Sequence, residues 1–354
     1  SSDVCSSDLF PLQTLLIAVA TGTGVGMNAL LSKSLGERNF KKANKIADNA
    51  AFIYAISYIV FLILGFTIVK PFYASQIGNA DVEIMNLGID YLSTVMIFSF
   101  GLFTQIFFER LLTSTGRTIF SMTSQLCGAI TNIILDPIMI FGLNMGVRGA
   151  ALATVISQAV SCIIVVVFLC SKKSILRLKR KNLNIKPKVV FPCIALGTAA
   201  FIMQASESVI SVCFNSSLLK YGGDIAVGAM TILTSVMQFA MLPLQGIAQG
   251  AQPITSYNYG ANNTERVKKT FRVLLTVNLI YSVTLWLAVM LMPQFFVSIF
   301  TPETAMIEFA SKALRIYMAV MFLFGIQIAC QMTFTALGNA ISSIIVAVTR
   351  KFIL

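Results

Sequence analysis

The sequence contains no histidine, a single tryptophan and few charged residues. Charged side chains make up 11% of the 354 residues, whereas soluble domains carry roughly a quarter, so this chain cannot cover a large core with a polar surface. Histidine is the commonest metal ligand and general base, and its absence argues against a membrane enzyme. The formal charge is +12, but the basic residues gather in clusters between uncharged stretches, which favours membrane topology over nucleic-acid binding.

The cysteines do not indicate a disulfide framework or a zinc site. Six of the seven lie within or at the ends of apolar runs, and none forms a CxxC pair. Buried free cysteine is the better interpretation.

What the chain does have is a series of long apolar runs, with 56% hydrophobic residues and a mean hydropathy of +0.83. A membrane-spanning helix needs about 20 mostly apolar residues, and about ten such runs follow one another. They cover 9–32, 46–69, 88–109, 118–141, 147–170, 190–219, 225–256, 273–300, 313–336 and a last run from 341, which ends with the chain before it could cross. We therefore predict an all-α integral membrane protein.

The distribution of lysine and arginine predicts the orientation of these spans. One set of alternate connections is rich in basic residues, namely 33–45, 110–117, 172–188 and 266–272, whereas the opposite set holds only Lys70, Arg148, Lys220, Lys312 and Arg315. By the positive-inside rule the basic set is cytoplasmic. The longest polar connection divides the chain into an N-terminal lobe, 9–170, a linker, 171–189, and a C-terminal lobe, 190–354. Residues 1–8 resemble nothing downstream and have no basic leader region, so we expect them to be foreign to the natural sequence.

The two lobes contain an internal repeat. Adding 224 to the positions of Gly22, Gly26, Ser32, Gly36 and Asn39 gives Gly246, Gly250, Ser256, Gly260 and Asn263, and Gln105 and Gly116 match Gln327 and Gly338 at an offset of 222. The repeat unit covers about six spans, an even number, so the copies are parallel and the implied whole has about twelve spans. The glycines at 22–26 lack a phosphate-loop ending, and close helix packing is the better interpretation.

Few ionisable residues lie within the predicted spans, and such residues are functional candidates because charge in hydrocarbon is costly. Asn132 and Asp136 are four residues apart, so their oxygens face one side of a helix. Pro137 leaves the carbonyl of Ile133 without its helical partner. A carboxylate, an amide oxygen and free carbonyls suit Na⁺, or a proton carried by the carboxyl group. The alternative is that Asp136 caps a kinked helix end near the headgroups.

Glu207 is the second candidate, in the segment Met203-Gln204-Ala205-Ser206-Glu207 near the middle of the predicted span 190–219. Gln204 lies one turn before it and completes a polar stripe. A buried glutamate could alternate between holding a proton and binding a cationic compound. The alternative is a structural hydrogen bond between helices.

Several segments resemble the multidrug and toxic compound extrusion (MATE) family, and its bacterial branch in particular. They are 22–37, Leu135-Asp136-Pro137 with 146–154, 221–224, 249–253 and 259–261. The resemblance runs from about residue 9 to the end. It implies a two-lobed antiporter with about twelve spans, which expels organic, often cationic, compounds in exchange for Na⁺ or H⁺.

The resemblance also implies site residues. The family's first-lobe cation site uses an Asn and an Asp four apart, a Thr on the next span and an Asp on the opening span. Asn132, Asp136 and Thr154 match the first three, and no segment here matches the fourth. Glu207, with Gln204 and Met203 beside it, matches a second-lobe acidic site, but the stretch 316–335 lacks the acid that accompanies it in those members.

We accordingly expect a bacterial plasma-membrane protein that is monomeric, takes small organic substrates, needs no cofactor beyond a coupling ion and binds no nucleic acid. A flippase for lipid-linked precursors, from the same superfamily, is the main alternative and predicts a more cationic cavity. A membrane enzyme and a channel fit less well, because paired acids and histidine are absent and the buried acids suit a coupled carrier.

Overall fold

The computed structural model describes residues 2–67, 69, 82–170 and 187–353, and throughout these ranges the regular elements are helices. Residues 171–186, most of the predicted linker, and the side chains of residues 1–8 lie outside what is described. The helices in chain order are α1 (Ser2–Gly36), α2 (Phe40–Thr67), α4 (Val82–Ile97), α5 (Phe100–Ser114), α6 (Thr118–Pro137), the π-helix η1 (Ile138–Gly142), α7 (Gly146–Cys170), α8 (Pro187–Gly260), α9 (Thr264–Leu291), α10 (Pro293–Ser298), α11 (Thr304–Tyr317), α12 (Phe322–Leu337) and α13 (Ala340–Ile353).

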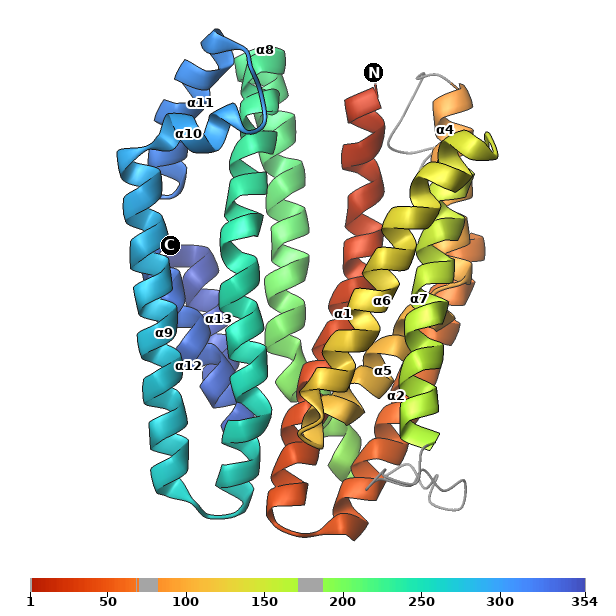
Figure 1. Ribbon diagram of the computed structural model, residues 1–354, viewed down its shortest axis with the longest axis vertical. Coiled ribbons are helices and arrows are strands. Elements are labelled where there is room, and N and C mark those ends of the chain that lie inside the picture. The colour runs from red at the N-terminus through yellow and green to blue at the C-terminus, as the bar shows by residue number, and fades with distance from the viewer. Residues whose placement is uncertain (1, 68, 70–81, 171–186, 354) are drawn as a thin grey trace.

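The helices confirm a protein that spans the membrane many times. Within the described residues, 7 helices are long and apolar enough to cross, or 9 if each bent pair counts as one span. The shorter apolar helix Ala340–Thr349 corresponds to the last predicted run. The segment α8 contains two spans, Val189–Ser206 and Ile225–Gly260, and Figure 1 shows it turning back on itself between them.

Two spans that we predicted as single helices, 88–109 and 313–336, are bent. The angle is 47° between Tyr91–Ile97 and Phe100–Ser114, and 46° between Thr304–Tyr317 and Phe322–Leu337. At the first break the Ser99 hydroxyl donates to the carbonyl of Met96 over 2.7 Å, the kind of local bond that competes with helical pairing. The run 273–300 is likewise interrupted, because α9 ends at Leu291 and a short helix begins at Pro293.

The backbone repeats with the same offset as the sequence. Arg38 and Asn262, 224 residues apart, are non-glycine residues with φ of 55° and 56°. The next residue in each copy, Asn39 or Asn263, accepts a hydrogen bond from the backbone amide three positions on, at 3.0 and 3.2 Å. Gly116 and Gly338 have φ of 81° and 83°. The turns that follow equivalent helices are therefore built in the same way.

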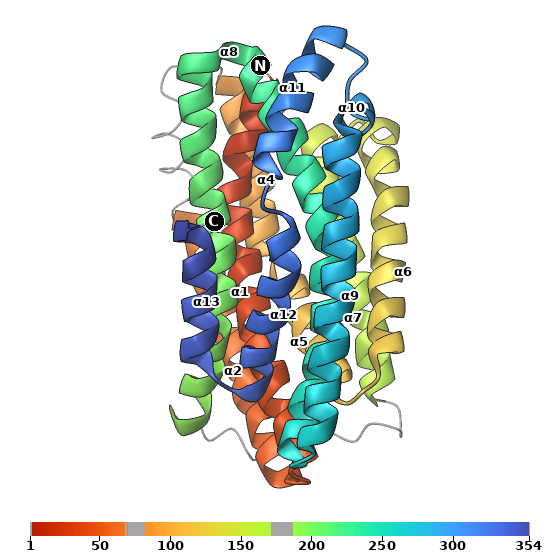
Figure 2. The ribbon, with the colours of Figure 1, turned by 90° about the vertical axis from the view of Figure 1, so that its left-hand side faces the viewer.

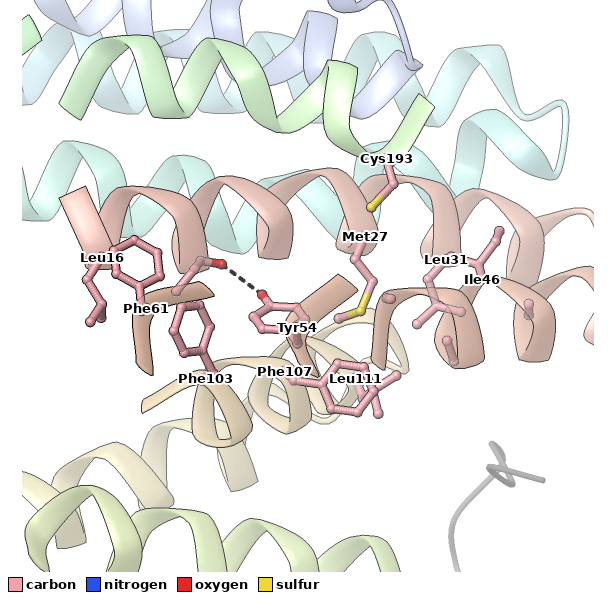
Figure 3. Close-up of a cluster of buried hydrophobic side chains, with 14 of the residues drawn as sticks. Leu16, Met27, Leu31, Ile46, Tyr54, Phe61, Phe103, Phe107, Leu111 and Cys193 are labelled. Carbon is pink, nitrogen blue, oxygen red and sulfur yellow. Dashed lines mark hydrogen bonds between the residues drawn. The ribbon is translucent and has the colours of Figure 1, made fainter. Parts of the chain in front are cut away.

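The helices form two bundles that lie side by side (Figures 1 and 2), and the buried side chains form two hydrophobic cores, one mainly within each lobe. In the first, Tyr54 packs between Phe103 and Phe107, with ring centroids 6.1 and 5.5 Å away, and its hydroxyl donates to the carbonyl of Ala20 over 2.8 Å (Figure 3). The second core is formed by α8 from Ala229 onward together with residues of α9, α10, α11 and α12.

Three basic turns within the described residues lie at one end of the molecule, which we call the basic end. It carries the turns 37–39, 115–117 and 261–263, at the bottom of Figure 1. The alternation of chain direction predicted from the apolar runs is therefore confirmed for the described turns. Which face of the membrane this end occupies stays a prediction.

Glycines bring α1 against the first leg of α8. A Cβ on Gly22 would lie 2.9 Å from the carbonyl oxygen of Gly197, and one on Gly26 would collide with the carbonyl of Cys193. Figure 3 shows Cys193 above Met27 of α1. The predicted role of these glycines in helix packing is confirmed, since any side chain would force the two backbones apart.

Replacing Gly26 by alanine is therefore expected to destabilise the protein by about 1–3 kcal/mol, read as a lower apparent melting temperature in detergent. Gly101→Ala is the matched control, because a Cβ there would meet its nearest atom at an ordinary 3.6 Å. Equal melting temperatures for the two variants would contradict the packing described.

Candidate functional site

The predicted carboxylate and amide meet on α6. The side-chain nitrogen of Asn132 donates to Oδ1 of Asp136 over 3.3 Å, one helical turn away, and both side chains are half-buried. The pair thus combines a carboxylate with the oxygen of a side-chain amide. These are hard oxygen ligands of the kind that Na⁺ takes, and a proton could occupy the same carboxylate.

The helical path does not end at Pro137, as the capping alternative for Asp136 requires. It continues as the π-helix Ile138–Gly142, in which the amide of Leu143 donates to the carbonyl of Ile138 over 2.9 Å. Asp136 therefore lies inside the span Thr118–Gly142. A π-turn shifts the backbone pairing by one residue and is frequent at functional sites.

The third predicted residue of this site, Thr154, lies on the antiparallel helix α7. Ser124 and Ser161 exchange hydrogen bonds between hydroxyls and carbonyls over 2.8 and 3.0 Å. Further along, a Cβ on Gly149 would lie 2.7 Å from the carbonyl of Met139. This register sets Thr154 level with the stretch between Asn132 and Asp136. Its hydroxyl, however, donates to the carbonyl of Ala150 in its own helix over 3.0 Å, so Thr154 is level with the pair along the helices but bonds within α7.

The second-lobe candidates lie on another helix. Met203 and Gln204 are half-buried on the first leg of α8, whereas the side chain of Glu207 lies outside the described residues. The helix α12 covers the stretch in which some family members carry an acidic residue and this chain has none. There Gln327 donates to Gln331 over 2.5 Å. Nearby in α9, Asn278 is fully buried and neither of its amide atoms has a hydrogen-bond partner, a site that the sequence analysis missed.

The two lobes meet along a seam between α1 and the second leg of α8, and the seam follows the repeat. Asn28 donates to the side chain of Gln252 over 3.2 Å, and these residues occupy equivalent positions 224 apart. Gln252 in turn donates to the carbonyl of Val25 over 3.0 Å. Both side chains are almost fully buried. Two equivalent residues can touch only if they lie near the axis that relates the lobes.

Reciprocal glycine contacts extend this seam towards the basic end. A Cβ on Gly36 would collide with the carbonyl of Tyr257, and one on Gly260 would collide with the carbonyl of Lys33. The two contacts are equivalent in the repeat, because adding the offset of 224 to the residues of the first lobe gives those of the second. The seam therefore closes tightly at the basic end, with backbone against backbone.

Arg110 crosses the seam. The side chain of Arg110 is 7% exposed and donates from Nη2 to Oε1 of Gln249 in the other lobe over 2.9 Å, while its Nε has no hydrogen-bond partner. It passes close to Gly24, where a Cβ would lie 3.1 Å from the Arg110 Cγ.

Sequence reasoning missed these seam residues, although a signal was present. Asn28, Gln249 and Gln252 are polar residues inside apolar runs, and Asn28 and Gln252 are equivalent in the repeat. The repeat was recognised only from identical residues, so a pair of different amides went unnoticed.

A crevice of about 930 Å³ opens between the lobes beside the seam, at the basic end. It is lined by the end of α1, the start of α2, the turn between α5 and α6, and the second leg of α8. Its lining residues are Leu35, Arg38, Phe40, Thr113–Gly116, Thr118, Gly250, Pro253, Ile254, Tyr257 and Asn258.

Comparison with known proteins agrees with this architecture. Residues 8–138 and 199–354 match the family model MatE. The multidrug export protein MepA of Staphylococcus haemolyticus is 28% identical over 344 residues, which cover 96% of this chain and 74% of that protein. MepA of Staphylococcus aureus is 26% identical over 349 residues, covering 97% and 75%.

Solved structures give the same picture. The MATE multidrug transporter DinF-BH, solved as a complex, is 32% identical and superposes with a TM-score of 0.89 over 99% of this chain and 78% of that one. A MATE protein in the straight conformation superposes with a TM-score of 0.91 at 22% identity, covering 99% and 78%. With the family model matching most of its length, this chain belongs to the MatE family of membrane transporters.

Proposed function

We propose that this protein is a secondary active antiporter that exports organic, often cationic, compounds in exchange for Na⁺ or H⁺. The observation that carries the proposal is the hydrogen-bonded pair Asn132–Asp136 inside a span. Such a carboxylate is costly in hydrocarbon unless it binds a cation or a proton. The names of the relatives, multidrug export proteins and a multidrug transporter, support the substrate class.

The two lobes supply the movement that such exchange requires. We infer that the basic end faces the cytoplasm of a bacterial cell, as the positive-inside rule predicts. The seam of Asn28, Gln252 and the paired glycines then holds the two lobes together at the cytoplasmic end, beside the crevice. Exchange would need the seam to open in the alternate state, so that ion and substrate reach opposite sides in turn.

We assign a separate role to each residue of the site. Asp136 would hold the ion or proton, and the Asn132 amide, which donates to one carboxylate oxygen, would orient it. Thr154 lies level with the pair and could supply a hydroxyl oxygen by turning from the Ala150 carbonyl. In the second lobe, Met203, Gln204 and Glu207 remain candidates for substrate or proton binding. We expect a monomer that needs no cofactor beyond the coupling ion.

The flippase alternative is not favoured by the crevice between the lobes. Among its lining residues one, Arg38, is cationic, and the others are apolar or carry hydroxyl, amide or backbone groups. A pathway for anionic lipid-linked precursors would need more positive charge along its walls.

Replacing Asp136 by asparagine is expected to abolish gradient-driven efflux of a fluorescent cationic dye by the full-length protein, because the neutral amide can neither neutralise a cation nor carry a proton. The matched control is Glu303→Gln, which makes the same change at an exposed position. Both variants should reach the membrane at wild-type levels. Unchanged efflux by Asp136→Asn would remove this residue from the mechanism.

The coupling ion is identified by transport into proteoliposomes at fixed pH with and without a Na⁺ gradient. Na⁺-driven transport that persists without a pH gradient assigns Na⁺, and the converse assigns H⁺. Transport that needs neither gradient would contradict antiport.

Replacing Arg110 by methionine is expected to favour the open seam about tenfold or more, because a hydrogen bond to a charged group contributes about 1.5–3 kcal/mol. Gln249→Met removes the acceptor and should act in the same direction. The measurement is the distance distribution between spin labels at Lys41→Cys and Thr264→Cys, exposed positions at the basic end of each lobe, in a cysteine-free background. Lys45→Met is the control for lost charge. Distributions that match the wild type in both seam variants would show that the bridge does not hold the seam.

A further inference from the structure

A second groove lies on the side of the second lobe, between the last turns of α8 and the first turns of α9. Its volume is about 480 Å³, and it is lined by Ile247, Ala251, Ile254, Asn258, Arg266, Lys269, Thr270, Val273, Leu274 and Val277. Most of the wall is aliphatic, and Leu274 forms a buried floor. Ile254, Val273 and Val277 are 52%, 56% and 41% exposed.

The polar groups of this groove are confined to one end. Arg266 and Lys269 are exposed in the first turns of α9, and Thr270 lies beside them. Among the described residues, neither cation forms a salt bridge with a carboxylate. The groove therefore has a positive mouth at the basic end and an apolar body further into the membrane.

The dimensions of the groove match one leaflet of a bilayer. From Arg266 to Val277 the helix rises by about 16 Å, and half of a hydrocarbon core is about 15 Å thick. A molecule with a negative headgroup and an aliphatic chain fits this groove. Its headgroup would lie beside Arg266 and Lys269, and its chain would lie along Val273 and Val277.

We propose that this groove is a binding site for one anionic phospholipid. The phosphate accepts hydrogen bonds from Arg266 and Lys269, and one acyl chain lies along the aliphatic wall of α8 and α9. Basic pockets between membrane helices at the cytoplasmic level are suited to such headgroups. Ile254 and Asn258 also line the crevice between the lobes, so the lipid would contact a helix of the seam. The proposal does not depend on the transport function.

The test is native mass spectrometry of the full-length protein in detergent, titrated with phosphatidylglycerol or with phosphatidylcholine of the same acyl chains. The double variant Arg266→Gln/Lys269→Gln is expected to weaken the tightest phosphatidylglycerol binding about 30-fold, from about 1 kcal/mol for each basic residue. Phosphatidylcholine should bind more weakly to the wild type and respond little to the variant.

The matched control is Lys268→Gln/Arg272→Gln, which removes the same charge from the same helix at residues outside the groove. An equal loss of phosphatidylglycerol binding in this control would overturn the proposal, since it would show attraction to the basic surface as a whole. Equal affinity of the wild type for the two lipids would also overturn it.

The apolar part of the site is tested separately with Val273→Trp, which fills the groove without changing the charge. This variant is expected to lose phosphatidylglycerol binding while keeping the wild-type melting temperature. Glycerophosphoglycerol, which has the headgroup but no chains, should not compete. If glycerophosphoglycerol competed at the concentrations at which the lipid binds, the aliphatic wall of the groove would not contribute to binding.

Discussion

The contact on which the architecture depends is the close approach of α1 to α8. Gly22 and Gly26 allow the first leg of α8 to pack against the α1 backbone, and Gly36 with Gly260 allows the second leg to do so nearer the basic end. Helices in lipid gain little from hydrophobic association, and they are held together by packing and hydrogen bonds. Contacts between backbones are therefore sensitive to single methyl groups at these glycines.

The polar bridge of the seam is one-sided, although the surrounding contacts are symmetric. The repeat offset of 222 carries Arg110 to Met332, and the offset of 224 carries Gln249 back to Val25, so no counterpart can form. The acceptor is a neutral amide, which binds a guanidinium less strongly than a carboxylate would. Burial of Arg110 costs solvation, and the bond to Gln249 offsets part of that cost. A bridge of this strength can hold two lobes together and still open, which a buried ion pair would resist more strongly.

Sequence patterns predicted most of the fold because the bilayer imposes one length scale. Apolar runs located the spans, and the offset between Gly36 and Gly260 revealed the repeat that the backbone shows again at Arg38 and Asn262. The spacing of Asn132 and Asp136 was enough to predict that they share a helix face, since residues four apart lie one turn from each other; their hydrogen bond was found only in the structure. The bend at Ser99 could not be predicted, because apolar residues flank it and hydropathy does not register backbone pairing. Pro137 indicated disturbed helical pairing, but not that the helix continues as a π-turn. The burial of Arg110 could not be predicted either, because its hydrogen-bond partner, Gln249, is distant in the sequence.

The helix α5 links the candidate cation site to the seam. Its Gly101 faces Gln158 of α7, where a Cβ would lie 3.6 Å away, and its Arg110 reaches Gln249 in the other lobe. The helix α7 in turn packs on α6, which carries Asn132 and Asp136, through the paired hydrogen bonds of Ser124 and Ser161. The bend of 47° between α4 and α5 separates α5 from the helix before it. One helix thus contacts both α7, which packs on the helix that carries Asp136, and the opposite lobe, so a contiguous path of packed helices joins the candidate cation site to the seam.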